Sequence, residues 1–263
     1  MRNMMMMALG LTLGAANASG QAVLYFSFGT DGASSREMVV AYRNTTDAPA
    51  ALTLEVYDYE GGLMEVPYLA DNNGVARLRR VTQELSAHGS GAVATNARGT
   101  SYQKGWMRIV SRPAGAIAVT VHSRSRDSNG TSAHLFSLQP IPNQQSFTIG
   151  PFDNASQDQY LIANNSSEAD RVTLIGRSRT GGEVCRASFQ IQPARWYKVA
   201  ISDTLPCLAG KPGTLEVQSD HGNVAAMLFL INAAGSAIPV HPDANAGDIW
   251  SQLKKRAGVT LPF

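Results

Sequence analysis

Short stretches in which apolar and polar residues alternate recur along most of the chain. Residues 50–60 (AALTLEVYDYE) and 116–123 (AIAVTVHS) are clear examples in the first half, and residues 171–179 (RVTLIGRSR) and 214–219 (TLEVQS) in the second. Alternation places one set of side chains on a buried face and the other in solvent, which is typical of antiparallel β-strands. Clusters of Gly, Asn, Asp and Pro separate these stretches. The pattern predicts an all-β protein built from antiparallel β-sandwiches.

The order of these stretches repeats. Residues 38–62 align with residues 160–182, because each block has a strand ending at an Asn (Asn44, Asn165), a polar turn, a second strand and a closing Gly-Gly. The other matched blocks are residues 85–96 with 191–202 and residues 105–123 with 213–231. Three blocks matched in the same order predict two tandem sandwiches, which are two copies of one fold.

The repeat sets the predicted domain boundaries. Residues 19–140 form the first sandwich and residues 141–240 the second, joined by a proline-containing extended linker at Leu138–Gly150. The first copy is longer between its matched blocks, so we expect an insertion at about residues 69–103. Residues 241–263 form a separate tail.

The first residues of the chain are typical of a secretory signal peptide. Arg2 is followed by the apolar run Met4–Leu13 and by an A-x-A cleavage pattern ending at Ala18, which predicts a signal peptide over residues 1–18. The apolar run is about half the ~20 residues that a membrane-spanning helix requires. No later segment is apolar for long enough either, so the sequence predicts export and no transmembrane segment in the mature chain.

The tail contains the one helical pattern after the signal peptide. Residues 248–257 place Ile249, Trp250 and Leu253 on one face, with Asp248 as the N-cap and cations at the end. Two interpretations remain open. The helix docks on its own domain, or it docks peripherally on a partner or a membrane surface.

The only two cysteines are Cys185 and Cys207. An even pair in an exported protein predicts one structural disulfide. A thiol nucleophile would need a neighbouring His, and a metal site would need more soft ligands than the chain provides. No metal and no cofactor are therefore expected.

The charges are nearly balanced, with 22 Lys and Arg against 20 Asp and Glu and a formal net charge of +2. This balance gives no long-range attraction to nucleic acid, which is not an expected partner. The densest basic groups are Arg124/Arg126 and Arg77/Arg79/Arg80, and the second group lies in the insertion. On a strand, Arg77 and Arg79 would share one face and Arg80 the other. We interpret Arg77, Arg79 and Arg80 as the binding site for an anionic partner, or alternatively as a solvated strand edge.

No motif with a catalytic spacing is present. The five histidines are scattered without metal-ligand spacing, and Gly89-Ser90-Gly91 is not a nucleophile elbow. We therefore expect a non-catalytic protein. An enzyme that acts on polysaccharide is the alternative, and it would require carboxylates that converge in space.

The repeated blocks resemble immunoglobulin-like repeats of secreted bacterial proteins. The resemblance covers most of the mature chain, rests on the strand–Asn–turn–strand–Gly-Gly block and the hairpins at residues 105–123 and 213–231, and implies a fold rather than an activity. A weaker similarity links two such domains with one disulfide to periplasmic pilus chaperones, which donate a strand to an open sheet. The donor strand and the anchoring cationic pair of that family are not found here.

These features together predict an exported, non-catalytic binding or structural protein of the periplasm or the cell surface. Its expected partner is an envelope or surface protein, or an anionic polysaccharide, contacted through sandwich loops or edges. The alternative is a chaperone-like strand donor for a subunit of a surface fibre.

Overall fold

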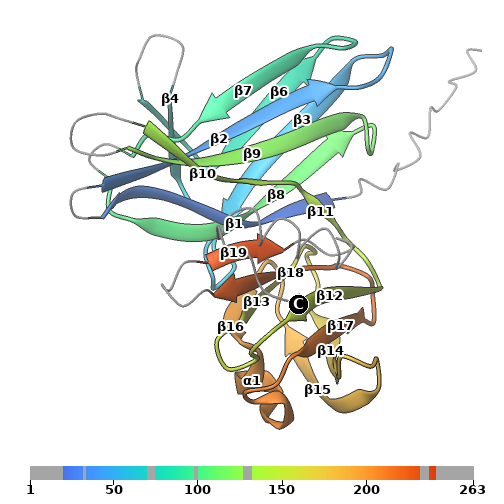
Figure 1. Ribbon diagram of the computed structural model, residues 1–263. Helices are drawn as coiled ribbons and strands as arrows, with labels where there is room; N and C mark the ends of the chain where they lie inside the picture. Colours follow the sequence, from blue (N-terminus) through green and yellow to red (C-terminus); the bar gives the residue numbers. More distant parts are fainter. Residues whose placement is uncertain are drawn as a thin grey trace, which may run out of the picture.

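The computed structural model describes residues 20–31, 34–69, 75–97, 100–126, 132–231 and 237–240. This part of the chain is almost entirely strand and turn, which confirms the all-β class. The strands form two sandwiches, drawn one above the other in Figure 1. No helix of the described ranges has the length and apolar character needed to cross a membrane. The predicted signal peptide and the helix predicted at residues 248–257 lie outside the described residues.

The first sandwich is one nine-stranded antiparallel sheet folded into two layers. Strand β1 joins the layers, because residues up to Phe28 pair with β8 and the last residues, from Gly29, pair with β2. One layer contains β1 (Gly20–Asp31), β3 (Ala50–Tyr57), β6 (Arg80–Leu85), β8 (Gln103–Arg112) and β11 (Ile141–Pro142). The other contains β2 (Ser34–Asn44), β7 (Ser90–Ala94), β9 (Ile117–Arg126) and β10 (Ser132–Leu138).

The second sandwich consists of two four-stranded sheets. One sheet contains β12 (Ser146–Phe152), β14 (Asp170–Arg177), β15 (Glu183–Ile191) and β17 (Gly213–Ser219). The other contains β13 (Gln159–Asn164), β16 (Trp196–Ala200), β18 (Val224–Ile231) and β19 (Ala237–Val240). The connection from β16 to β17 holds the short helix α1 (Ile201–Thr204) and the 3₁₀ turn η1 (Pro206–Leu208).

The strand order is the same in both sandwiches. The order β6-β3-β8-β1 corresponds to β15-β14-β17-β12, and β7-β2-β9-β10 corresponds to β16-β13-β18-β19. The glycine that opens each matched hairpin has the same role. A methyl group on Gly105 would collide with the carbonyl oxygen of Tyr57, and one on Gly213 would collide with that of Arg177. Two strands approach so closely there that only glycine fits.

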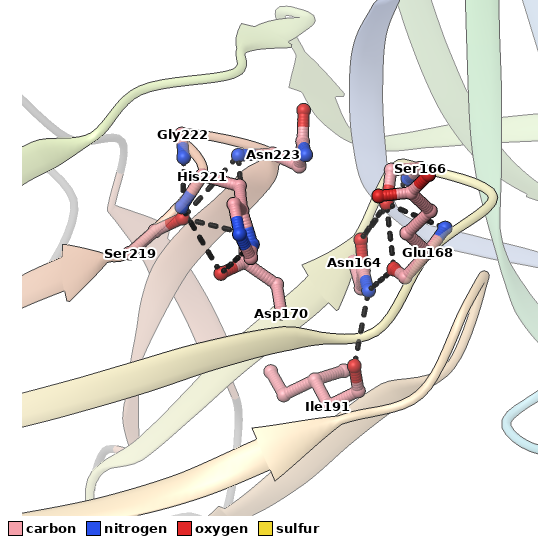
Figure 2. Close-up of polar contacts among 9 residues, drawn as sticks. All are labelled: Asn164, Ser166, Glu168, Asp170, Ile191, Ser219, His221, Gly222 and Asn223. Carbon is pink, nitrogen blue, oxygen red and sulfur yellow. Dashed lines mark hydrogen bonds and ion pairs between the residues drawn. The ribbon is translucent and has the colours of Figure 1, made fainter.

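A buried Asn holds the turn that follows β2 and β13. Asn44 donates from Nδ2 to the carbonyl oxygens of Ala48 and Ser86, at 2.7 and 2.9 Å. Asn164 makes the same contacts, donating to Glu168 at 2.6 Å and to Ile191 at 3.0 Å (Figure 2).

The position of this Asn corrects the sequence alignment, which placed Asn165 opposite Asn44. Asn164 is fully buried, and its Oδ1 accepts hydrogen bonds from the backbone N–H and the hydroxyl of Ser166. The side chain of Asn165 instead donates from Nδ2 to Oδ1 of Asn143 at 3.0 Å. Asn164 is the last residue of β13, as Asn44 is the last residue of β2, and from that position its side chain reaches the turn that follows.

The insertion is shorter than the predicted range of 69–103. Residues 58–79 connect β3 to β6, whereas residues 178–182 connect β14 to β15. The extra residues contain one hairpin, β4 (Val66–Leu69) paired with β5 (Val75–Leu78). Residues 95–102, which were also assigned to the insertion, correspond to the longer segment 201–212 that contains α1 and η1.

The two sandwiches share a hydrophobic core. Along β18, the side chains of Val224, Ala226 and Leu228 belong to the second core, while the alternate residues Met227 and Phe229 belong to the first. Strand β13 alternates in the same way, with Tyr160 and Ile162 in the second core and Leu161 and Ala163 in the first. Strands β13 and β18 are therefore buried on both faces of their sheet.

Strand β1 is the main surface against which this sheet packs. Every residue from Ala22 to Phe28 is buried. In the predicted linker, Ile141 and Pro142 form β11, which extends the sheet beside the start of β1. The indole N–H of Trp106 donates to the carbonyl oxygen of Ala194 at 2.8 Å, a hydrogen bond between the two sandwiches. A large apolar interface of this kind fixes the relative orientation of two domains.

The disulfide predicted from the sequence is present. Cys185 on β15 is bonded to Cys207 on η1, with 6.5 Å between the Cα atoms. The bond ties the connection between β16 and β17 to an edge strand of the second sandwich, where Leu205 and Leu208 complete the core.

We expect the replacement Asn164→Ala to lower the free energy of unfolding by about 3 kcal/mol, because the carbonyl oxygens of Ile191 and Glu168 lose their donor and a fully buried side chain is removed. Asn165→Ala, which removes one side-chain contact, should cost about 1 kcal/mol or less. Urea denaturation of both variants measures the difference. Equal losses would contradict the corrected alignment.

Reduction of the disulfide should lower the free energy of unfolding by about 3 kcal/mol, because the cross-link closes a loop with a sequence separation of 22. The measurement is urea denaturation with and without a reducing agent. A variant with both cysteines replaced by Ala serves as the control, and its stability should match that of the reduced protein and not respond to reductant.

Candidate functional site

The β4–β5 hairpin is the part of the first sandwich that has no counterpart in the second. Its base is held firmly. Tyr68 is buried and forms a β-bridge with Thr95, and the backbone N–H of Asn96 donates to the carbonyl oxygen of Pro67 at 2.7 Å. Thr95 in turn accepts from the backbone N–H of Met38 through Oγ1 at 2.9 Å. The hairpin is therefore fixed to β2 and to the segment that follows β7.

One face of the hairpin is exposed, and we call Leu69, Val75 and Arg77 the hairpin face. Leu69 and Val75 lie directly opposite each other on the two strands, and they are 41% and 49% exposed. Arg77 follows on the same face of β5, since strand residues two apart point to the same side. The described residues include six exposed large hydrophobic side chains, of which the hairpin carries three: Leu69, Val75 and Leu78. The face is thus an apolar surface beside a cation.

The structure divides the predicted arginine site. Arg77 lies on β5, Arg79 lies between β5 and β6, and Arg80 is the first residue of β6. The expectation that one strand carries all three was therefore wrong, because the chain changes sheets at Arg79. Arg77 and Arg79 are exposed and form no ion pair with the side chains that the structure describes, whereas Arg80 is paired with Glu55.

Arg80 belongs to a buried ionic group that the sequence analysis missed, here called the Glu55 cluster. Glu55, on β3, accepts from Nε of Arg80 at 2.7 Å and from Nη2 of Arg108 at 2.6 Å. The hydroxyl of Tyr57 donates to Glu55 at 2.9 Å. Glu55 is only 4% exposed, so its charge needs these partners. In the sequence, Glu55 is recognisable as the one charged residue of the strand AALTLEVY at residues 50–57.

The partners of the cluster set the titration of Glu55 and Tyr57. Burial acts to raise the pKa of Glu55, but the hydrogen bonds from Arg108 and Arg80 outweigh it and lower that pKa below the usual value of 4.5. Burial raises the pKa of Tyr57 to about 12. At neutral pH the carboxylate is ionised and the phenol is protonated, so the cluster is an ion pair inside the fold and its role is structural.

The second sandwich has an ion pair between the equivalent strands, β14 and β17. Its acid lies on β17, whereas the acid of the Glu55 cluster lies on β3, the strand equivalent to β14. Glu216 on β17 corresponds to Arg108 on β8, and it pairs with Arg177 on β14. Arg177 Nε lies 2.8 Å from Glu216 Oε2, and these hydrogen bonds lower the pKa of the carboxylate. The equivalent strand pairs β3–β8 and β14–β17 are each joined by one acid and at least one arginine.

The other basic group noted in the sequence, Arg124 and Arg126, is also matched by an acid. Glu37 on β2 is buried and accepts from Nε of Arg124 at 2.9 Å, and Nη2 of Arg126 lies 3.7 Å away. The first sandwich therefore neutralises two basic groups with glutamates of its own.

A Ser, a His and an Asp come together in the second sandwich, but their geometry is structural (Figure 2). Ser219 Oγ donates to Asp170 Oδ2 at 2.6 Å and accepts from the backbone N–H of Gly222 at 2.8 Å. His221 Nδ1 lies 3.4 Å from Asp170 Oδ1. A nucleophilic serine would have its hydroxyl bonded to the imidazole, whereas Ser219 is buried and bonded to the acid. The group holds the turn between β17 and β18.

Three or more metal-ligating side chains do not come together anywhere in the described ranges. The described basic, acidic and histidine clusters thus provide no cage for a metal ion.

No protein-family model matches the chain, and no curated protein does. Among solved structures, Bacteroides uniformis β-glucuronidase 2, covalently bound to cyclophellitol-6-carboxylate aziridine, aligns with 8% identity and a TM-score of 0.18. That alignment covers 86% of this chain but only 26% of the glucuronidase chain. An anti-sigma factor domain-containing protein aligns with 9% identity and a TM-score of 0.14, over 85% of this chain and 96% of the other. Similarities this weak carry no argument about function.

We expect Glu55→Gln to lower the free energy of unfolding at pH 7 by about 2 kcal/mol, because both arginines lose their counter-charge but keep contact with water. The lowered pKa of Glu55 means that its contribution is present at neutral pH and is lost as the pH falls below the usual carboxyl value of 4.5. The gap between the variant and the original protein should therefore narrow in acid.

Chemical denaturation across the pH range from neutral to acid measures this gap. The matched control is Glu84→Gln, which changes an exposed glutamate on the same strand as Arg80. A loss of equal size in both variants, or one that does not depend on pH, would contradict the assigned role of Glu55.

Proposed function

We propose that this chain is an exported, non-catalytic binding protein that contacts a protein partner in the periplasm or at the cell surface through the hairpin face. The observation that carries the proposal is the β4–β5 hairpin. The second sandwich reaches the same strand order without it, so the hairpin is not required to build the fold. It nevertheless exposes apolar side chains and an arginine.

The composition of the hairpin face favours a protein over a polysaccharide. Leu69 and Val75 offer aliphatic contact area. Arg77 offers a planar guanidinium group, which can form two parallel hydrogen bonds with a carboxylate. Strand β5 pairs only with β4 among the described residues, so its other edge has backbone groups that an extended segment can pair with. The expected partner therefore presents an apolar segment with an acidic residue.

Two features support a location outside the cytoplasm. The signal-peptide pattern at residues 1–18 predicts export, and the Cys185–Cys207 disulfide suits an oxidising compartment.

A photo-crosslinking residue placed at position 69 should capture a discrete partner when the protein is expressed in its own cell envelope. The same residue at position 184 is the control, because Leu69 and Val184 are both 41% exposed and lie on different sandwiches. Mass spectrometry of the crosslinked product identifies the partner and the contact residues. Equal capture at both positions would contradict a specific role for the hairpin face.

The charge of the hairpin face is tested by Arg77→Glu, which should weaken capture at position 69 by about tenfold or more. Arg171→Glu reverses an exposed arginine on β14 and should leave capture unchanged. Thermal melting checks that both variants are folded. If the partner is instead a fibre subunit crosslinked along an edge strand away from the hairpin, the chaperone-like alternative replaces this proposal.

A further inference from the structure

A second group of cations lies where the first sandwich meets the second, and it is not part of the hairpin. We call it the Tyr25 cluster, and it consists of Tyr25 on β1, Arg36 on β2, Tyr102, Lys104 on β8 and Lys198 on β16. Four members come from the first sandwich and one comes from the second. Lys198 therefore joins the cluster only when the two sandwiches are packed together.

The centre of the cluster is a triangle of polar atoms. Arg36 Nη1 donates to the hydroxyl oxygens of Tyr25 and Tyr102, at 3.1 Å each, and the two hydroxyl oxygens lie 3.2 Å apart. A guanidinium can only donate, so the two phenols share one O–H···O bond between them. The second phenol proton is not used within this triangle.

Two lysine ammonium groups lie within cation–π distance of the aromatic rings of Tyr25, Tyr102 and Phe229. The Lys104 ammonium lies 5.4 Å from the ring centroid of Tyr102, and the Lys198 ammonium lies 5.4 Å from that of Tyr25 and 5.0 Å from that of Phe229. Desolvation, and then the charges of Lys104 and Arg36, lower the pKa of Lys198. The three cations are therefore near enough to repel one another.

The Tyr25 cluster differs from the Glu55 cluster and from the Arg124/Arg126 group in lacking an acid. Glu55 neutralises Arg80 and Arg108, and Glu37 neutralises Arg124 and Arg126. In the Tyr25 cluster, no described carboxylate forms an ion pair with any of the three cations. The unused polar groups of the three cations are all donors: the remaining guanidinium N–H groups of Arg36 and the ammonium groups of Lys104 and Lys198.

We propose that the Tyr25 cluster is a binding site for a phosphate group, either a free ion or one carried by a sugar. Three cations and a hydroxyl donor match the charge and the several acceptor oxygens of a phosphate dianion. A single carboxylate would leave two of the cations without a counter-charge. The site is independent of the hairpin face and of the partner proposed for it.

Isothermal titration calorimetry of the purified protein with inorganic phosphate, at constant ionic strength and pH 7.5, tests the site. Saturable binding of one phosphate per chain is expected, and Lys198→Met should weaken it by about tenfold or more. Met keeps the apolar stem over the rings of Tyr25 and Phe229. Removing one of three repelling charges should not lower the melting temperature without phosphate.

The matched control is Lys211→Met, which makes the same change at an exposed lysine of the second sandwich and should leave binding unchanged. Tyr25→Phe, which keeps the ring and removes the hydroxyl, should weaken binding. Glucose 1-phosphate as a second probe distinguishes the sources: tighter binding than inorganic phosphate indicates a sugar-borne group, and equal binding indicates the free ion. No saturable binding of either probe, or an equal loss in Lys211→Met, would overturn the proposal.

Discussion

The burial of strands β13 and β18 on both of their faces is the constraint on which the rest of this structure depends. Strands β13 and β18 alternate their side chains between two cores, so the second sandwich is complete only when β1 covers its outer face. Burying residues such as Leu161, Met227 and Phe229 contributes about 2 kcal/mol each. Exposed in a separate domain, the same residues would form a large apolar patch. The two sandwiches consequently behave as one rigid unit.

Because the two sandwiches are packed in this way, a charged side chain buried within them needs an oppositely charged partner close by. Glu55 and Glu37 are almost fully buried, and each is held by arginines from a neighbouring strand. The Tyr25 cluster lies where the two sandwiches meet: pairing of β1 with β2 and β8 places Tyr25, Arg36 and Lys104, and packing between the sandwiches brings Lys198 to them. Tyr25, at the centre of the cluster, is itself a residue of the shared core, so its position is set by the packing.

The sequence predicts well the features that depend on local pattern. Alternating strands, the Gly-Gly turns and the cysteine pair are each visible within a few tens of residues. The assignment of Asn165 failed because two adjacent asparagines differ only in which one faces the core, and strand register decides this. The Tyr25 cluster was invisible because its five residues are spread from position 25 to position 198. The uninterrupted apolar run VAAMLFLI at residues 224–231 is a signal of two-sided burial that pattern analysis can use.

The exchange of charges between the sandwiches bears on how a chain with two similar halves avoids misassembly. Tandem domains of one topology can trade strands while they fold. If β17 took the place of β8, Glu216 would lie opposite Glu55, and if β8 took the place of β17, Arg108 would lie beside Arg177. Both errors bring like charges together in a largely buried sheet, which is unfavourable. The opposite placement of the charges thus disfavours the exchange of β8 and β17 and favours the return of each strand to its own sandwich.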